Sequence, residues 1–115
     1  MEYKPGRVFD VVISISTIEH IGWDEIPQDE DKAGAALEVM SGLGRDLLIT
    51  MPVGYHRRLE TSFINGPFDA VALAVKTSRL GHWEARPIDG IGDIRYGYPY
   101  ALGNAVLVGT RGRIA

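Results

Sequence analysis

The residues best suited to chemistry lie together at the end of an apolar stretch. Residues Phe9–Ile15 read FDVVISI, and Ser16, Glu19 and His20 follow within five positions. A carboxylate beside an imidazole can share or transfer a proton near neutral pH, because an unperturbed histidine has a pKa of about 6.5. We therefore predict that Glu19 and His20 line a reactive cleft, with His20 as a candidate general base for a hydroxyl or an amine.

A structural interpretation of these side chains stays open. Glu19 could cap or orient the loop after the apolar stretch, and His20 could bond to the backbone. Trp23, Tyr55 and His56 could shape a substrate pocket, although such aromatic residues more often pack a loop. We predict no metal site, since Glu19, His20 and His56 could supply three ligands only if their loops converge.

A strand–helix–strand unit must position these groups. Val8–Ile15 is rich in Val and Ile and apolar on both faces, which predicts a strand buried on both sides. Apolar residues at helical spacing over 33–40 predict a helix, which Gly42 or Gly44 should end in a left-handed conformation. Residues 47–51, LLITM, predict a second strand. Ligands of such sheets bind beyond the carboxyl ends of parallel strands, so both polar clusters should share one edge.

The second half of the chain carries weaker signals. Leu59 and Phe63 predict a short helix that ends at residues 65–67, NGP. Residues 68–79 are compatible with a strand or a helix, and the alternation of valine and leucine over 71–75 favours a strand. A glycine-rich loop over 90–99 and a last short strand over 105–108 complete the prediction.

Composition narrows the class of protein. The 115 residues, 45% hydrophobic and 23% charged, predict a single domain over residues 1–115. A net charge of −3 gives no electrostatic case for binding nucleic acid, and the absence of cysteine excludes disulfides and thiolate metal sites. No apolar stretch approaches the roughly 18 residues of a membrane span. We expect a cytoplasmic protein with no membrane partner.

Three stretches resemble a known superfamily. Residues 9–22, FDVVISISTIEHIG, resemble the fourth-strand motif of the class I S-adenosylmethionine-dependent methyltransferases, with its trailing Glu-His. Residues 47–55, LLITMPVGY, resemble the fifth strand and its loop, and residues 98–100 with 104–109 are similar to the seventh-strand region of a poorly characterised branch. The resemblance implies an α/β fold: a partial Rossmann-like methyltransferase sheet, mostly parallel with an antiparallel last strand, lacking the first three strands.

The resemblance also implies a ligand. The cofactor would be S-adenosylmethionine, and Ser14, Ile15 and Ser16 would pass close to its methionine part, mainly through backbone groups. Alternatively, the serine hydroxyls simply satisfy local backbone donors at a strand end. The superfamily's glycine-rich turn after the first strand and its ribose-binding acid after the second have no counterpart here. We therefore expect the C-terminal half of a methyltransferase that binds cofactor weakly or not at all alone and is inactive without an N-terminal half.

Several expectations about partners follow. The methyl acceptor, a small molecule or a macromolecule, is unknown. Two other functions stay open, a non-catalytic α/β interaction module and a truncated reading frame without independent function. Without strands one to three, the Phe9–Ile15 strand would leave an apolar sheet edge. We expect a second copy of the chain, as a homodimer, or another partner chain to cover it.

Overall fold

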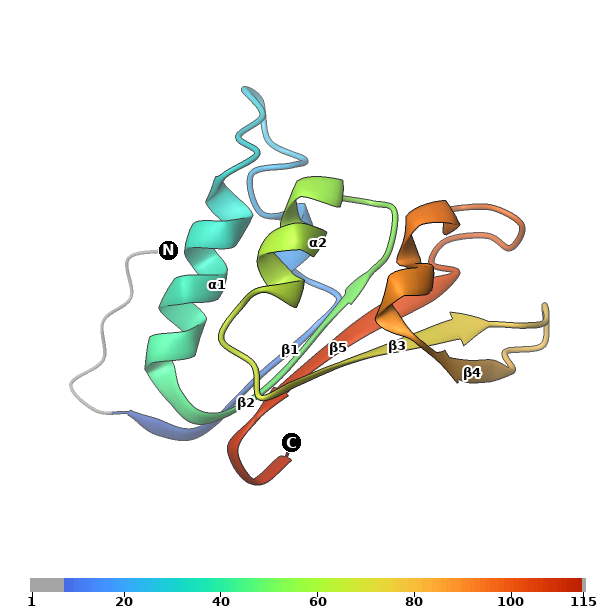
Figure 1. Cartoon of the computed structure of the whole chain (residues 1–115). Helices are drawn as coiled ribbons and strands as arrows, with labels where there is room; N and C mark the ends of the chain where they lie inside the picture. Colours follow the sequence, from blue (N-terminus) through green and yellow to red (C-terminus); the bar gives the residue numbers. More distant parts are fainter. Residues whose placement is uncertain (1–7, 115) are drawn as a thin grey trace.

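The structure is a computed structural model that describes residues 8–114, in which a five-stranded sheet carries two α-helices on one face (Figure 1). The strands are β1 (Phe9–Ile15), β2 (Gly44–Pro52), β3 (Ala70–Lys76), β4 (Trp83–Arg86) and β5 (Ala105–Arg111). The α-helices are α1 (Lys32–Leu43) and α2 (Arg57–Ile64), and short 3-10 helices span Ile18–His20, Ile88–Asp93 and Gly112–Ile114. Within the described residues, no helix combines the length and apolar character needed to cross a bilayer.

The sheet is mixed, with the strand order β1-β2-β5-β3-β4. β1 and β2 are parallel, and the other neighbouring pairs are antiparallel. The predicted α/β class is confirmed, whereas the prediction of a mostly parallel sheet is wrong. The reason is that β5 is inserted between β2 and β3 and runs opposite to both, as predicted for the last strand. In addition, β4 follows β3 through a short hairpin, which only antiparallel strands can form.

Helix α1 confirms the predicted stripe, because Ala33, Ala36, Leu37 and Met40 are all buried. Its predicted ending is wrong, since Gly44 is extended, with φ −136°, and begins β2 directly. A Cβ on Gly44 would lie 2.6 Å from Val12 Cγ2, so close packing favours glycine here. The carbonyl groups at the helix end are satisfied by Arg111 of β5, whose Nη2 donates to the oxygens of Ser41 and Gly44 at 2.6 and 2.7 Å.

One face of the sheet, here called the covered face, lies under α1, α2 and the 3-10 helix Ile88–Asp93 (Figure 1). Side chains alternate along each strand, and the register aligns Leu47, Ile49 and Met51 of β2 with Leu107 of β5 and Leu73 of β3 on this face. These residues are 0–2% exposed. Ile49, Met51, Leu73 and Leu107 belong to one core cluster with Leu37 of α1 and with Leu59 and Phe63 of α2. This face therefore contains the hydrophobic core.

The opposite face, here called the bare face, has no α-helix over it among the described residues. The register aligns Ile13 and Ile15 of β1 with Leu48 and Thr50 of β2, and continues through Val108 and Val106 of β5 to Ala72 and Ala74 of β3. Ile13 and Ile15 are 60% and 57% exposed. The prediction that Val8–Ile15 is buried on both sides is therefore wrong. β1 lies at the end of the strand order, and both α-helices pack on the same face.

The remaining elements follow the sequence prediction in part. The short helix at Leu59 and Phe63 is α2, the favoured strand within 68–79 is β3, and the last strand is β5. Strand β4 was not predicted, because its sequence, WEAR, has no apolar alternation and all four residues are exposed. The 3-10 helix Ile88–Asp93 overlaps the start of the predicted glycine-rich loop over 90–99.

Candidate functional site

A hollow of about 350 Å³ lies at the carboxyl ends of β1 and β2. On one side it is lined by Ser16, Glu19 and His20, which follow β1, and by Pro52 and Tyr55, at and after the end of β2. The amide of Ser16, which has φ +47°, donates to Thr50 O and Thr50 Oγ1, both at 3.1 Å. The two polar clusters therefore meet at one edge of the sheet, as predicted.

The opposite wall of the hollow comes from the second half of the chain. It consists of Trp83, Tyr96, Leu102, Gly103 and Val106. Val106 pairs with Pro52 across β5 and β2, and both belong to the bare face. The hollow therefore lies where the bare face reaches the carboxyl ends of the parallel strands.

Glu19 is the most buried ionisable group of the hollow, with 1% of its surface exposed. Its Oε1 has no hydrogen-bond partner among the described residues. Its Oε2 lies 3.5 Å from His20 Nε2. Burial raises the pKa of the Glu19 carboxyl, and this effect outweighs the opposing effects of its own backbone amide and of His20. An unpaired carboxylate oxygen in such a position costs free energy unless something supplies a donor.

His20 is held between two carboxyl groups. Its Nδ1 lies 2.5 Å from Asp24 Oδ2, while its Nε2 faces Glu19. Asp24 also accepts a hydrogen bond of 2.5 Å from the Tyr55 hydroxyl. These bonds from Tyr55 and His20 lower the pKa of Asp24, and the Asp24 carboxylate raises that of Tyr55 to about 12. Asp24 thus fixes the His20 ring with Nε2 turned towards Glu19.

Tyr55 and Tyr96, which line the hollow, are positioned by a hydrogen-bond network around Gly54. Gly54 has φ +88°, and a Cβ there would lie 2.6 Å from the Tyr96 amide nitrogen, so the site requires glycine. The Gly54 amide donates to buried Glu60 at 2.8 Å, and Arg57 donates to the other Glu60 oxygen at 3.1 Å. Arg57 also donates to the carbonyl oxygens of the 88–94 segment. The Tyr55 and Tyr96 rings then meet edge to face, 5.1 Å apart.

The residues predicted to approach a cofactor are divided between the two faces. Ser14 aligns with Ile49 on the covered face, whereas Ile15 aligns with Thr50 on the bare face. Of the three, Ser16 lines the hollow. The backbone turn at Ser16 therefore brings the end of β1 to the hollow, and the role of Ser14, Ile15 and Ser16 in cofactor binding stays a prediction.

Trp23 and His56 lie behind the hollow rather than in its lining. Their rings stack 4.3 Å apart at 29°. His56 is buried and precedes α2, where its Nδ1 accepts from the Leu59 amide at 3.2 Å. Burial lowers the pKa of His56. Of the three residues predicted to bind substrate, Tyr55 lines the hollow; Trp23 and His56 instead support the start of α2.

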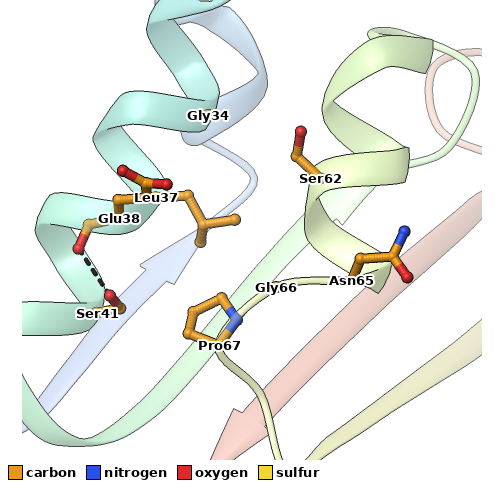
Figure 2. A pocket seen from close by; sticks show the side chains of 8 residues that line it. All are labelled: Gly34, Leu37, Glu38, Ser41, Ser62, Asn65, Gly66 and Pro67. Carbon is orange, nitrogen blue, oxygen red and sulfur yellow. Dashed lines mark hydrogen bonds between the residues drawn. The ribbon is translucent and has the colours of Figure 1, made fainter.

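A second hollow, of about 430 Å³, lies between α1 and α2 (Figure 2). Figure 2 shows Leu37 pointing from α1 towards α2, which carries Ser62 and Asn65, with Pro67 below them. Ser41 donates to the Glu38 carbonyl oxygen at 2.7 Å. Unlike the hollow at the strand ends, this groove has no buried polar atom without a partner among the described residues. It therefore lacks the feature that marks the first hollow.

Sequence reasoning missed several residues of the site, among them Asp24, Trp83 and Tyr96. Asp24 stands four positions after His20, a spacing that brings side chains together when the backbone turns, as it does here. Trp83 and Tyr96 reach the hollow through the hairpin and loop of the second half, whose strand register no local sequence pattern predicts. Among the described residues, no group of three or more His, Asp or Glu side chains is placed to hold a metal ion.

Comparisons with known proteins add no relative. No protein-family model, no curated protein and no solved structure matches this chain. The hollow and the sheet are therefore the basis for a proposal of its function.

Proposed function

We propose that the chain is the C-terminal part of an S-adenosylmethionine-dependent methyltransferase, with the methyl-transfer cleft at the carboxyl ends of β1 and β2. The observation that carries this proposal is the meeting of Ser16, Glu19, His20 and Tyr55 in one hollow at the end of a parallel strand pair. This is where open α/β sheets bind their ligands. The antiparallel last strand β5 also fits the resemblance to a Rossmann-like methyltransferase sheet.

The roles of the residues follow from their contacts. Asp24 orients His20, as a carboxylate commonly orients an imidazole base. With Nδ1 donating to Asp24, Nε2 is the nitrogen that accepts a proton from an acceptor hydroxyl or amine. Tyr55, kept protonated by Asp24, donates to that carboxylate and closes one side of the hollow. Positioning supplies most of the catalysis, because transfer between two held reactants gains chiefly from proximity and orientation.

The cofactor fits the residues present only in part. When bound, S-adenosylmethionine supplies an electrophilic methyl group on a sulfonium. The turn at Ser16 presents backbone and hydroxyl groups that could hold its methionine part. The superfamily's glycine-rich turn after the first strand and its ribose-binding acid after the second, which would hold the rest of the cofactor, have no counterpart in this chain. The bare face continues from the hollow across the sheet, so further elements packed there would complete the cofactor site.

Nuclear magnetic resonance of the chain with millimolar S-adenosylmethionine tests this proposal. We expect weak binding with amide shifts centred on Ile15 and Ser16, and no comparable shifts around the α1–α2 groove. The absence of shifts at the end of β1 would contradict the proposed cofactor position. A dissociation constant in the micromolar range would show that the chain binds the cofactor without an N-terminal half, and the proposal that this half is needed would be wrong.

The bare face favours a second candidate function, a non-catalytic α/β interaction module. An exposed sheet face rich in Ile, Val and Ala is typical of a surface that binds another protein. For such a module, the Glu19–His20–Asp24 cluster would only hold the loop after β1. In such a module, His20→Gln would leave both small-molecule binding and assembly unchanged. The methyltransferase proposal predicts instead that His20→Gln removes methyl-transfer activity when the chain is combined with its N-terminal half.

A further inference from the structure

We propose that the hollow at the strand ends binds an amine carried on a flat apolar group, such as an aromatic ring. This inference rests on the proposed function only in identifying the amine as the methyl acceptor. The proposed binding rests on the residues that line the hollow and on the buried Glu19 carboxyl oxygen that has no hydrogen-bond partner among the described residues.

The first argument is charge. Glu19 lines the hollow, and its buried Oε1 has no hydrogen-bond partner among the described residues. The Asp24 carboxylate behind His20 is already paired with His20 and Tyr55, so Glu19 carries the charge available to a ligand. No lysine or arginine is among the described residues that line the hollow. The complement of this lining is a ligand that brings donors and positive charge, which an ammonium group does and a phosphate or carboxylate does not.

Glu60 shows what a purely structural buried glutamate looks like in this fold. It is also buried, but one oxygen accepts from the Gly54 amide at 2.8 Å and the other from Arg57 at 3.1 Å. In Glu19, by contrast, Oε2 lies 3.5 Å from the His20 imidazole, its own backbone amide interacts with the carboxyl, and Oε1 is buried without a hydrogen-bond partner among the described residues. Because an unsatisfied buried carboxylate destabilises a fold, a ligand donor that pairs it explains its presence in the lining.

The second argument is the aromatic wall. The Tyr55 ring lies between His20 and Tyr96, with centroids 4.9 and 5.1 Å away, both edge to face. Trp83, which is 45% exposed, lines the same hollow. Aromatic faces attract cations and pack flat apolar groups. A ligand that combines an ammonium group with a ring therefore matches both Glu19 and the aromatic wall.

Titration of the chain with benzylamine and with benzyl alcohol tests this inference by nuclear magnetic resonance. The probes share a ring and differ in the ammonium group. We expect both to shift the Trp83 indole and Gly103 amide signals, with benzylamine binding at least roughly tenfold more tightly, as charge-assisted hydrogen bonds require. Glu19→Gln should abolish that preference, and Glu38→Gln, at an exposed carboxylate of the α1–α2 groove, should preserve it.

Equal affinity for the two probes, or a preference retained in Glu19→Gln, would overturn the inference. A second readout uses the unsubstituted chain: bound benzylamine should lower the pH at which the Glu19 carboxyl titrates, and an unchanged midpoint would contradict binding at Glu19. The outcome is separable from that of the cofactor experiment. Cofactor shifts at Ser16 without amine binding would overturn only the acceptor class, and amine binding without cofactor shifts would overturn only the methyltransferase proposal.

Discussion

The two faces of the sheet carry similar apolar side chains in very different surroundings. On the covered face, Ile49 and Met51 are fully buried under two helices. On the bare face, Ile13 and Ile15, from the neighbouring strand, keep more than half of their surface exposed. Apolar alternation in a sequence thus shows that burying the side chains is favourable, but not whether the same chain or another molecule covers them. On the covered face the same chain covers them; on the bare face we infer that another molecule does.

The largest expected difference between the faces is in stability. Phe63 is fully buried on the covered side, with its ring 4.6 Å from that of Phe68. Phe63→Ala should lower the free energy of unfolding by about 3–5 kcal/mol, because it removes a large side chain and leaves a cavity. Ile13→Ala on the bare face should change it by less than about 0.5 kcal/mol, measured under conditions where the chain is monomeric. Urea denaturation of both variants checks the contrast, and similar losses would show that Ile13 is packed.

On the covered side, Arg111 satisfies the carbonyl groups at the end of α1. Arg111→Ala should cost about 1–3 kcal/mol, because it removes the donor to the Ser41 and Gly44 carbonyl oxygens. Arg86→Ala is the matched control, since Arg86 makes an exposed ion pair with Glu84 on β4 and should contribute less than about 1 kcal/mol. Faster hydrogen exchange in the last turn of α1 should accompany the Arg111 loss. Equal stability of the two variants would contradict the capping role.

The pH dependence of stability should carry a contribution from His56. Its folded pKa is lowered by burial, so the unfolded chain binds more protons below about pH 6.5. Stability should therefore fall as the pH decreases from about 6.5 towards the lowered pKa, with a slope of at most about 1.4 kcal/mol per pH unit. His56→Asn keeps a residue able to cap α2 and should remove this slope in urea denaturation. A slope that persists unchanged would contradict the assignment.

Glu19, beside the bare face, should contribute with the opposite sign. Its folded pKa is raised above 4.5, so the folded chain holds its proton more tightly than the unfolded chain does. The resulting stabilisation is fully present below about pH 4.5 and is lost as the pH rises through the raised folded pKa. Glu19→Gln should therefore raise stability at neutral pH, by about 1 kcal/mol. A destabilised variant would show that the carboxylate is paired in the free protein.

Much of the local structure could be predicted from the sequence, because it depends on local patterns. The buried stripe of α1 follows from helical spacing, and the meeting of Glu19 with Tyr55 follows from the parallel pairing of two strands. The burial of β1 could not be predicted, since it depends on whether helices cover both faces. Trp83 and Tyr96 enter the site through the long-range pairing of β3, β4 and β5, for which no local pattern encodes the register.

Sedimentation velocity of the chain tests most directly whether the bare face is a binding surface, as we propose. At tens of micromolar, the unsubstituted chain should dimerise or form larger species, and the double variant Ile13→Lys/Ile15→Lys should be monomeric with little change in the urea midpoint at matched low concentration. Leu80→Lys, at an exposed position in the hairpin between β3 and β4, should associate like the unsubstituted chain. A clean monomer for the unsubstituted chain would contradict the claim.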